Sequence, residues 1–291
     1  MPRCVTLRRV ATLAGLGLVG IAIPARAQRP APLDPEKIRV CADPDNMPSS
    51  NDKLEGYENK LATLISQELK AKLEYVWYPT RRGYFRILNG MYCDLAIEVP
   101  AGLDMAGTTK PYFRSGYVFV TRKGSGLEDI KTLADPRLKK LKIGVNIYTS
   151  DAENSPPAMA LSQYGVVGNL TGYSTFFDEN NRPEDIINAV MKKDVDLAIA
   201  WGPLAGYFAK QGTVPLVLTP LPAKDSLSNF PFQYNIGIAV RRKDKEFRDS
   251  LEAVLTRRQP EVQAILKEYA VPLLPIEKDQ GGEKGEAKAS S

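Results

Sequence analysis

The hydrophobic positions of residues 38–100 follow two periods in turn. Apolar residues alternate with polar ones over residues 38–42, which is the period of a β-strand. Four apolar side chains within Tyr57–Leu69 recur at helical spacing and predict a helix that buries one face. Residues 73–79 and 93–100 again have strand character, and a second helical segment separates them. The pattern therefore predicts a strand-helix-strand-helix-strand unit whose strands pair in parallel through right-handed crossovers.

The loops that follow the first and third of these strands are expected to face one cleft, because ligands of parallel sheets bind beyond the carboxyl ends of the strands. Their polar side chains are the first candidate binding groups: Asp43, Asp45, Asn46 and Glu98. Asp43 and Asp45 also fit a plainer interpretation, in which they end a strand and start the turn before Pro48. The unit is interpreted as a binding lobe.

A second α/β series follows the first, and two similar strands flank it. Tyr117–Thr121 leaves the first unit, and Asn235–Val240 resembles it in length and character. This order predicts an α/β protein of two lobes with a hinge of two crossing strands. The expected first lobe is residues 38–121 plus 235–272, and the expected second lobe is residues 122–234.

Aromatic, basic and amide side chains follow several of the predicted strand ends in both lobes. They are the remaining candidates for binding a ligand or a partner: Trp77, Arg81, Arg82, Asn146, Tyr148 and Trp201. An aromatic concavity that carries arginine suits a peptide, a planar ligand or a segment of another protein, because Trp, Tyr and Arg dominate binding hot spots. Some of these side chains could instead be ordinary core or surface groups.

The N-terminal segment has the pattern of an export signal. Arginines precede an apolar run at residues 10–23, and a small-x-small pattern ends at Ala27. The run is short for a membrane span, so we expect a signal peptide at residues 1–27, a periplasmic protein and no membrane anchor. Residues 28–37 are a proline-bearing lead-in, and the charged tail at 277–291 is expected to be disordered.

Removal of the signal changes the charge of the chain. Of its 39 basic residues, four lie in residues 1–27, which leaves 35 against 34 acidic residues. No basic stripe remains, so a nucleic-acid partner is not expected.

The mature chain keeps two cysteines, Cys41 and Cys93. An oxidising periplasm favours a disulfide between them. The register argues against it, because Cys41 comes late in the first strand and Cys93 at the start of the third, an offset that can exceed the reach of a disulfide. The residues leave both outcomes open.

The chain contains no histidine. This excludes Ser-His-Asp and Cys-His mechanisms and the usual transition-metal ligands, and we expect neither a cofactor nor a metal site. Carboxylates at the cleft could still serve as general acid and base. A small periplasmic lyase therefore remains a minor alternative to a binding protein.

The ordering of elements over about residues 38–269 resembles the type II periplasmic solute-binding proteins of the polar amino-acid receptor group. Three departures argue against amino-acid binding. The stretch Ala101–Gly107, where the family has the arginine for the α-carboxylate, has no cation before Lys110. Trp201 stands near the place of the acid for the α-ammonium, and Asn146–Thr149 replaces the usual glycine-threonine turn.

Five segments that follow one another along the chain narrow the resemblance to one branch of this fold: VCADPDNMPSSN, GYENKLA, YPTRRGYFR, MYCDLAIEVPAG and TTKPYFRSGYVFVTR. Together they resemble the quinoprotein-dehydrogenase-associated periplasmic proteins of the methanol dehydrogenase J type. The resemblance implies a non-enzymatic accessory protein for the maturation or activation of a PQQ-dependent methanol or alcohol dehydrogenase. The main alternative is a receptor of an ABC importer for a ligand that is not an amino acid, and adjacent genes would distinguish the two.

Overall fold

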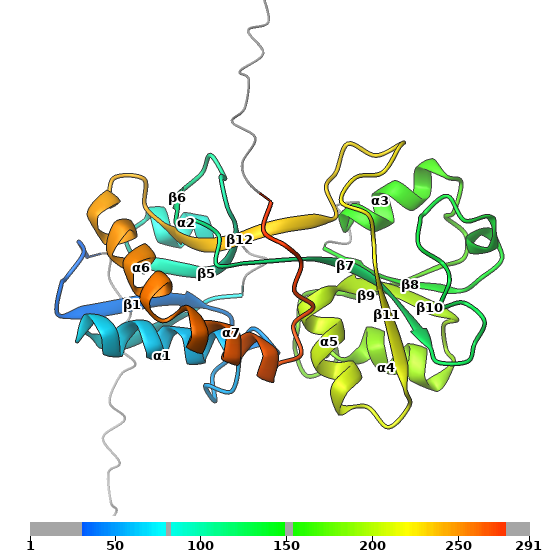
Figure 1. The fold of residues 1–291 in the computed structure, drawn as a ribbon, viewed down its shortest axis with the longest axis horizontal. Helices are drawn as coiled ribbons and strands as arrows, with labels where there is room; N and C mark the ends of the chain where they lie inside the picture. The colour runs from blue at the N-terminus through cyan, green and yellow to red at the C-terminus, as the bar shows by residue number, and fades with distance from the viewer. Residues whose placement is uncertain (1–30, 80–82, 149–153, 278–291) are drawn as a thin grey trace, which may run out of the picture.

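The computed structural model describes residues 31–79, 83–148 and 154–277, which fold into two α/β lobes (Figure 1). Two long strands, β7 (Phe113–Arg122) and β12 (Gln233–Val240), run between the lobes. The predicted two-lobe α/β architecture with a hinge of two crossing strands is confirmed.

The first lobe is built on a sheet in which β4, β1 and β5 are parallel neighbours and β12 pairs antiparallel with β5. Helices α1, α6 and α7 pack on one face through side chains such as Leu61 and Leu255. Helix α2 covers the opposite face with Leu88. The elements of this lobe are β1 (Lys37–Ala42), β2 (Asp45–Asn46), β3 (Ser50–Asn51), α1 (Tyr57–Leu69), β4 (Lys72–Trp77), α2 (Tyr84–Asn89), β5 (Leu95–Pro100), β6 (Gly107–Thr108), α6 (Lys245–Arg257) and α7 (Gln259–Glu268).

The second lobe continues the sheet in the order β7, β10, β8, β9, and β11 also pairs with β7. Apolar side chains on both faces of this sheet are buried, with Ile199 in one cluster and Ala198 in the other. This alternation explains the near-continuous apolar run of β10, since both faces are covered. The elements are the 3₁₀ helix η2 (Pro136–Lys139), β8 (Ile143–Ile147), α3 (Pro156–Gln163), β9 (Leu170–Ser174), α4 (Asp185–Lys192), β10 (Leu197–Trp201), α5 (Gly202–Gln211) and β11 (Leu216–Pro220).

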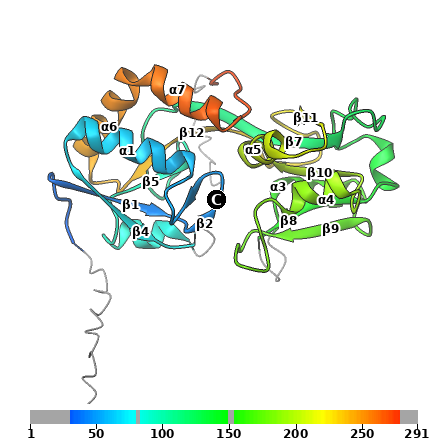
Figure 2. The same ribbon diagram turned by 90° about the horizontal axis from the view of Figure 1, so that it is seen from below.

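Strand β7 changes partner within its length, and this change makes the hinge. Phe113 to Gly116 pair with β12, whereas Tyr117 to Thr121 pair with β10. The last residue of β10, Trp201, pairs with Tyr117 at the point where the partner changes. The end of β10 therefore lies at the junction of the lobes. The short strand β2, which follows β1, lies on the side of the first lobe that faces the second lobe (Figure 2).

The C-terminal segment 271–277 crosses the hinge strands after α7 (Figure 1). The backbone N–H of Leu274 donates to the carbonyl of Arg114 in β7, and the buried Arg114 guanidinium pairs with Glu277 at 2.5 Å. Helix α5 lies so close to the start of this segment that a Cβ atom at Gly206 would clash with the carbonyl oxygen of Ala270, the residue just before it. The segment thus fastens α7 of the first lobe to the hinge and to α5 of the second.

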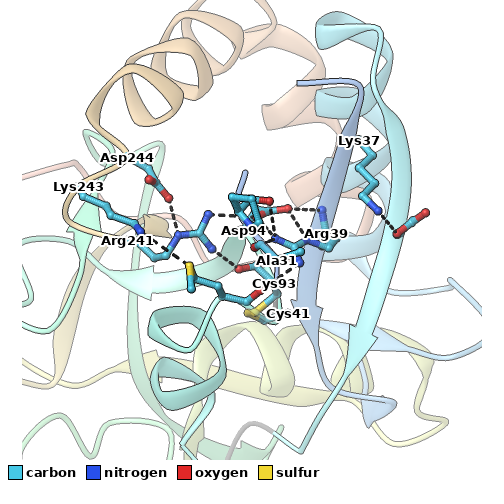
Figure 3. A network of polar contacts seen from close by, with 12 residues as sticks. Ala31, Lys37, Arg39, Cys41, Cys93, Asp94, Arg241, Lys243 and Asp244 are labelled. Atoms are coloured by element: carbon cyan, nitrogen blue, oxygen red, sulfur yellow. Dashed lines mark hydrogen bonds and ion pairs between the residues drawn. A yellow bond between two sulfur atoms is a disulfide. The ribbon is translucent and has the colours of Figure 1, made fainter. Parts of the chain in front are cut away.

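A buried ionic network joins three distant parts of the first lobe (Figure 3). The fully buried Asp94 carboxylate accepts hydrogen bonds from the Arg39 guanidinium at 2.6 and 2.9 Å and from Arg241 at 3.1 Å. Cys41 and Cys93 lie beside it and form a disulfide with Cα atoms 5.5 Å apart. Cys93 lies in the bend before β5, not in the strand, so the strand offset does not keep the two residues apart.

The predicted signal peptide at residues 1–27 lies outside the described residues, as does all of the predicted tail except Glu277. Within the described ranges, no helix is long and apolar enough to cross a membrane.

Candidate functional site

A cavity of about 550 Å³ lies between the two lobes, within the size range of small-molecule sites. The first lobe contributes the loop after β1 and the end of β5, and the second contributes the ends of β8 and β10 with the starts of α3 and α5. The described residues that line it are Asn46, Met47, Pro48, Ser49, Gly83, Phe85, Glu98, Pro100, Tyr117, Asn146, Tyr148, Pro156, Thr175, Phe177, Trp201, Leu204, Tyr234 and Ile236.

Glu98 reaches this cavity through a local distortion of β5. The register with β12 shifts between Gly237 and Ala239, opposite Glu98, and the Glu98 backbone has φ of +57°. A non-glycine residue in the left-handed region is strained, and such residues cluster at functional sites. A bulge of this kind re-aims a side chain. The carboxylate consequently faces the second lobe instead of following the alternation of the strand.

The Glu98 carboxylate connects the lobes. One oxygen accepts a hydrogen bond from Trp201 Nε1 of the second lobe at 2.7 Å. The other accepts one from the Ser49 hydroxyl of the first lobe at 2.5 Å. These two bonds fix the carboxylate at the meeting point of the lobes.

Aromatic rings form the wall of the cavity next to Trp201. The Trp201 ring makes edge-on contacts with Tyr117 at 5.5 Å and with Tyr234 at 6.0 Å between centroids. The hydroxyls of Tyr117 and Tyr148 are hydrogen-bonded at 2.7 Å. Burial raises the pKa of Tyr234 to about 12, and the charge of Tyr148 adds to the rise. Tyr234 is therefore a neutral hydrogen-bonding group at physiological pH.

A second, smaller cavity of about 50 Å³ lies beside the first and shares Asn46 and Glu98 with it. Asp43 and Glu58 also line it. Burial raises the pKa of Glu58 well above its usual range, and the charges of Glu98 and Asp43 raise it further. The folded structure thus favours the protonated form of Glu58 more than solvent does.

We predict that Glu58→Gln flattens the dependence of stability on pH. Because the folded state raises the Glu58 pKa, its protonated form stabilises the fold below about pH 4.3, and this contribution is lost as the pH rises toward the folded-state pKa. Melting temperatures of wild type and variant across this range would measure the difference.

Glu68→Gln is the matched control with the opposite sign. Hydrogen bonds from Arg258 and then Arg257 lower the Glu68 pKa, so its contribution is lost as the pH falls. If Glu58→Gln and wild type show parallel pH profiles, Glu58 does not carry a raised pKa.

The structure brings together most of the residues that the sequence proposed for the site. Five line the larger cavity: Asn46, Glu98, Asn146, Tyr148 and Trp201. Asp43 lines the smaller one. The positions of the predicted strand ends in the sequence were enough to predict that these residues lie at the cleft, because the carboxyl ends of the parallel strands meet there.

Two proposed residues line neither cavity. Asp45 is exposed and belongs to the short β2–β3 hairpin, where its N–H donates to Asp43 Oδ1. Trp77 stacks on Tyr75 at 4.7 Å and packs against the core under α1, because it is still within β4 and shares the face of Tyr75. Arg81 and Arg82 lie outside the described residues.

The sequence did not single out several lining residues. Tyr117 was assigned to a crossing strand, and Glu58 to the start of a helix, where an acid usually interacts with the helix dipole. Phe177 lies in a loop between β9 and α4. Only the tertiary packing of the chain places these side chains at the cavities, within the first lobe for Glu58 and between the lobes for Tyr117 and Phe177. Among the described residues, no group of three or more His, Cys, Asp or Glu is placed to hold a metal ion.

Comparison with known proteins gives consistent matches. The family model for bacterial extracellular solute-binding proteins matches residues 93–270. Protein MoxJ from Methylorubrum extorquens is 29% identical over 288 residues, which cover 91% of this chain and 94% of that protein. The crystal structure of the periplasmic binding protein XoxJ from Methylobacterium extorquens AM1 is 37% identical, with a TM-score of 0.66 and coverage of 82% and 100%. MxaJ from Methylophaga aminisulfidivorans MPT is 27% identical, with a TM-score of 0.67 and the same coverage.

Proposed function

Because this chain belongs to the bacterial extracellular solute-binding proteins and is of the MoxJ type, we propose that it is a periplasmic accessory protein for a PQQ-dependent methanol or alcohol dehydrogenase. Its role is the maturation or activation of that enzyme, and it catalyses no reaction itself. The five segments that resemble the dehydrogenase-associated family support the choice of partner.

The observation that carries this proposal is the position of Trp201 at the lobe junction. Trp201 occupies the place near which amino-acid receptors have an acid, and it hydrogen-bonds Glu98. The stretch Ala101–Gly107 offers no cation to a ligand carboxylate. An aromatic wall of this kind suits insertion of a side chain or loop from another protein, because aromatic residues dominate protein–protein hot spots.

We place dehydrogenase binding at the inter-lobe cavity, with residues 38–121 and 235–272 as one lobe and 122–234 as the other. Export through the predicted signal peptide would put the protein in the same compartment as its partner. Trp201 would then anchor the partner segment, with Arg81 and Arg82 as further contacts proposed from the sequence alone.

Deletion of the gene is expected to leave the dehydrogenase present but poorly active or poorly assembled. Immunoblotting of the periplasm and a dye-linked activity assay would measure the two quantities separately. Complementation with wild type should restore activity, and complementation with Trp201→Ala should not. Truncating a true anchor should weaken association by at least about 1–2 kcal/mol, which a titration with purified dehydrogenase would measure.

Tyr92→Ala is the matched control, since Tyr92 is an exposed aromatic residue that does not line the cavity. It should complement fully and bind as wild type does. The proposal is wrong if the deletion strain keeps normal dehydrogenase activity and neither the apo nor the mature enzyme forms a complex.

The cavity volume favours a second candidate, a receptor of an ABC importer for a small solute that is not an amino acid. In that case the deletion strain would lose uptake of one solute while dehydrogenase activity stays normal.

A further inference from the structure

Acidic residues lie at the inter-lobe cavity and at the smaller cavity beside it, and the described lining of both contains no basic residue. Among the described residues that line the inter-lobe cavity, Glu98 alone carries a formal charge. The adjoining smaller cavity shares Glu98 and adds Asp43 and Glu58, of which Glu58 has a raised pKa because it is buried; among the described residues, no lysine or arginine lines either cavity. Among these residues, an anionic group would find no cationic side chain to offset the loss of its hydration.

The aromatic wall provides the complementary feature. Ring faces attract cations that lie within about 6 Å of the ring centroid. The rings of Tyr117, Trp201 and Tyr234 are in consecutive contact at 5.5 and 6.0 Å, and Tyr148 extends the wall through its hydroxyl bond to Tyr117. These rings come from four separate segments, since Tyr117 and Tyr234 belong to β7 and β12, Trp201 ends β10 and Tyr148 follows β8. The contacts of Trp201 with Tyr117 and Tyr234 are edge-on, so these three rings do not form a flat stack.

Glu98 lies at the edge of this wall. The bond from Trp201 Nε1 at 2.7 Å and the bond from Ser49 at 2.5 Å leave the side chain partly exposed to the cavity. The carboxylate and the aromatic side chains line the same cavity, so a cation held there would lie near both. Neither feature alone would select a charge, but together they favour a positive one.

We infer that the inter-lobe cavity binds an alkylated ammonium or guanidinium group, held between the Glu98 carboxylate and the rings of Trp201, Tyr117 and Tyr234. The group can belong to a free small molecule or to a lysine or arginine side chain of a partner protein. The second source rests on the proposed function, and the first is independent of it. An amino acid is a poor ligand in either case, because its α-carboxylate would face Glu98.

Calorimetric titration of the mature full-length chain tests the inference with two matched pairs of probes. Choline and 3,3-dimethylbutan-1-ol have the same shape and differ in charge. Agmatine and arginine share the guanidinium and differ in the α-carboxylate. Choline should bind at least about tenfold more tightly than its neutral isostere, and agmatine at least about tenfold more tightly than arginine, as expected for one charge-assisted contact.

The variant Glu98→Gln should weaken binding of the cation by at least about tenfold, since the amide keeps an acceptor for Trp201 but removes the charge. Glu261→Gln, an exposed glutamate that lines neither cavity, should bind as wild type does. Circular dichroism and melting temperatures would establish that both variants are folded.

The possible results distinguish a free small molecule from a side chain of the partner as the source of the cation. They also distinguish a failure of this inference from a failure of the proposed accessory function. If the probes bind and depend on Glu98, the inference holds even where gene deletion leaves the dehydrogenase unaffected. If no probe binds but Glu98→Gln weakens association with the dehydrogenase at least tenfold, the cation is a side chain of the partner. Equal binding of choline and its isostere, unchanged binding by Glu98→Gln, or preferential binding of an anion that is lost in Arg81→Ala or Arg82→Ala would overturn it. Absence of both probe binding and any effect on association would also overturn it.

Discussion

Replacing Asp94 by alanine is expected to lower the free energy of unfolding by about 3–5 kcal/mol, because it leaves the buried Arg39 without a carboxylate and Arg241 with Asp244 alone. Asp94 is fully buried and accepts from both Arg39 and Arg241 (Figure 3). The side chains of these arginines are only 6% and 4% exposed, so water cannot replace the lost carboxylate. The network also holds the bend before β5, since the Arg39 N–H and guanidinium both donate to Asp94.

Urea unfolding followed by circular dichroism would measure this loss. Asp94→Asn keeps one acceptor oxygen, so its free energy of unfolding should lie between those of wild type and Asp94→Ala. Asp129→Ala removes an exposed carboxylate that pairs with Arg137, and its unfolding curve should overlay that of wild type. A loss below about 1 kcal/mol in Asp94→Ala would show that the buried network does not stabilise the first lobe.

Removal of the Cys41–Cys93 disulfide is expected to lower the free energy of unfolding by about 4 kcal/mol, because the unfolded chain gains conformational entropy without the cross-link. The two cysteines are 52 residues apart in sequence, so the bond closes a long loop that includes α1, β4 and α2. Both sulfurs are buried in the cluster under α2. The double variant Cys41→Ala, Cys93→Ala should therefore unfold at lower urea concentration with an intact far-ultraviolet spectrum before the transition.

A reductant provides the internal control for this prediction. It should lower the stability of wild type toward that of the double variant and leave the double variant unchanged. If thiol counting shows that the bond is reduced while the wild-type transition stays in place, the disulfide does not contribute the predicted stability.

The hydrophobic pattern alone determined the elements and their order. The alternating segment at residues 38–42 became β1, the apolar segment at 93–100 became β5, helical spacing over Tyr57–Leu69 became α1, and the two similar strands became β7 and β12. The helix was found because it buries one face, whereas the strands were found as short apolar runs, because helices cover both faces of the sheet. The polar loops after parallel strands were found because strand direction fixes which ends meet.

The tertiary structure decided which side chains reach the site and which reach the core. The bulge opposite β12 turns Glu98 toward Trp201, a residue 103 positions later in the chain. Trp77 was expected after the end of a strand, yet it is the last residue of β4, where it pairs with Ala42 of β1 and stacks on Tyr75. The ion pair of Asp94 with Arg241 and the raised pKa of Glu58 likewise have no periodic signal in the sequence. Such features depend on contacts between distant segments, and only the packed chain sets the distances, burial and charges that define them.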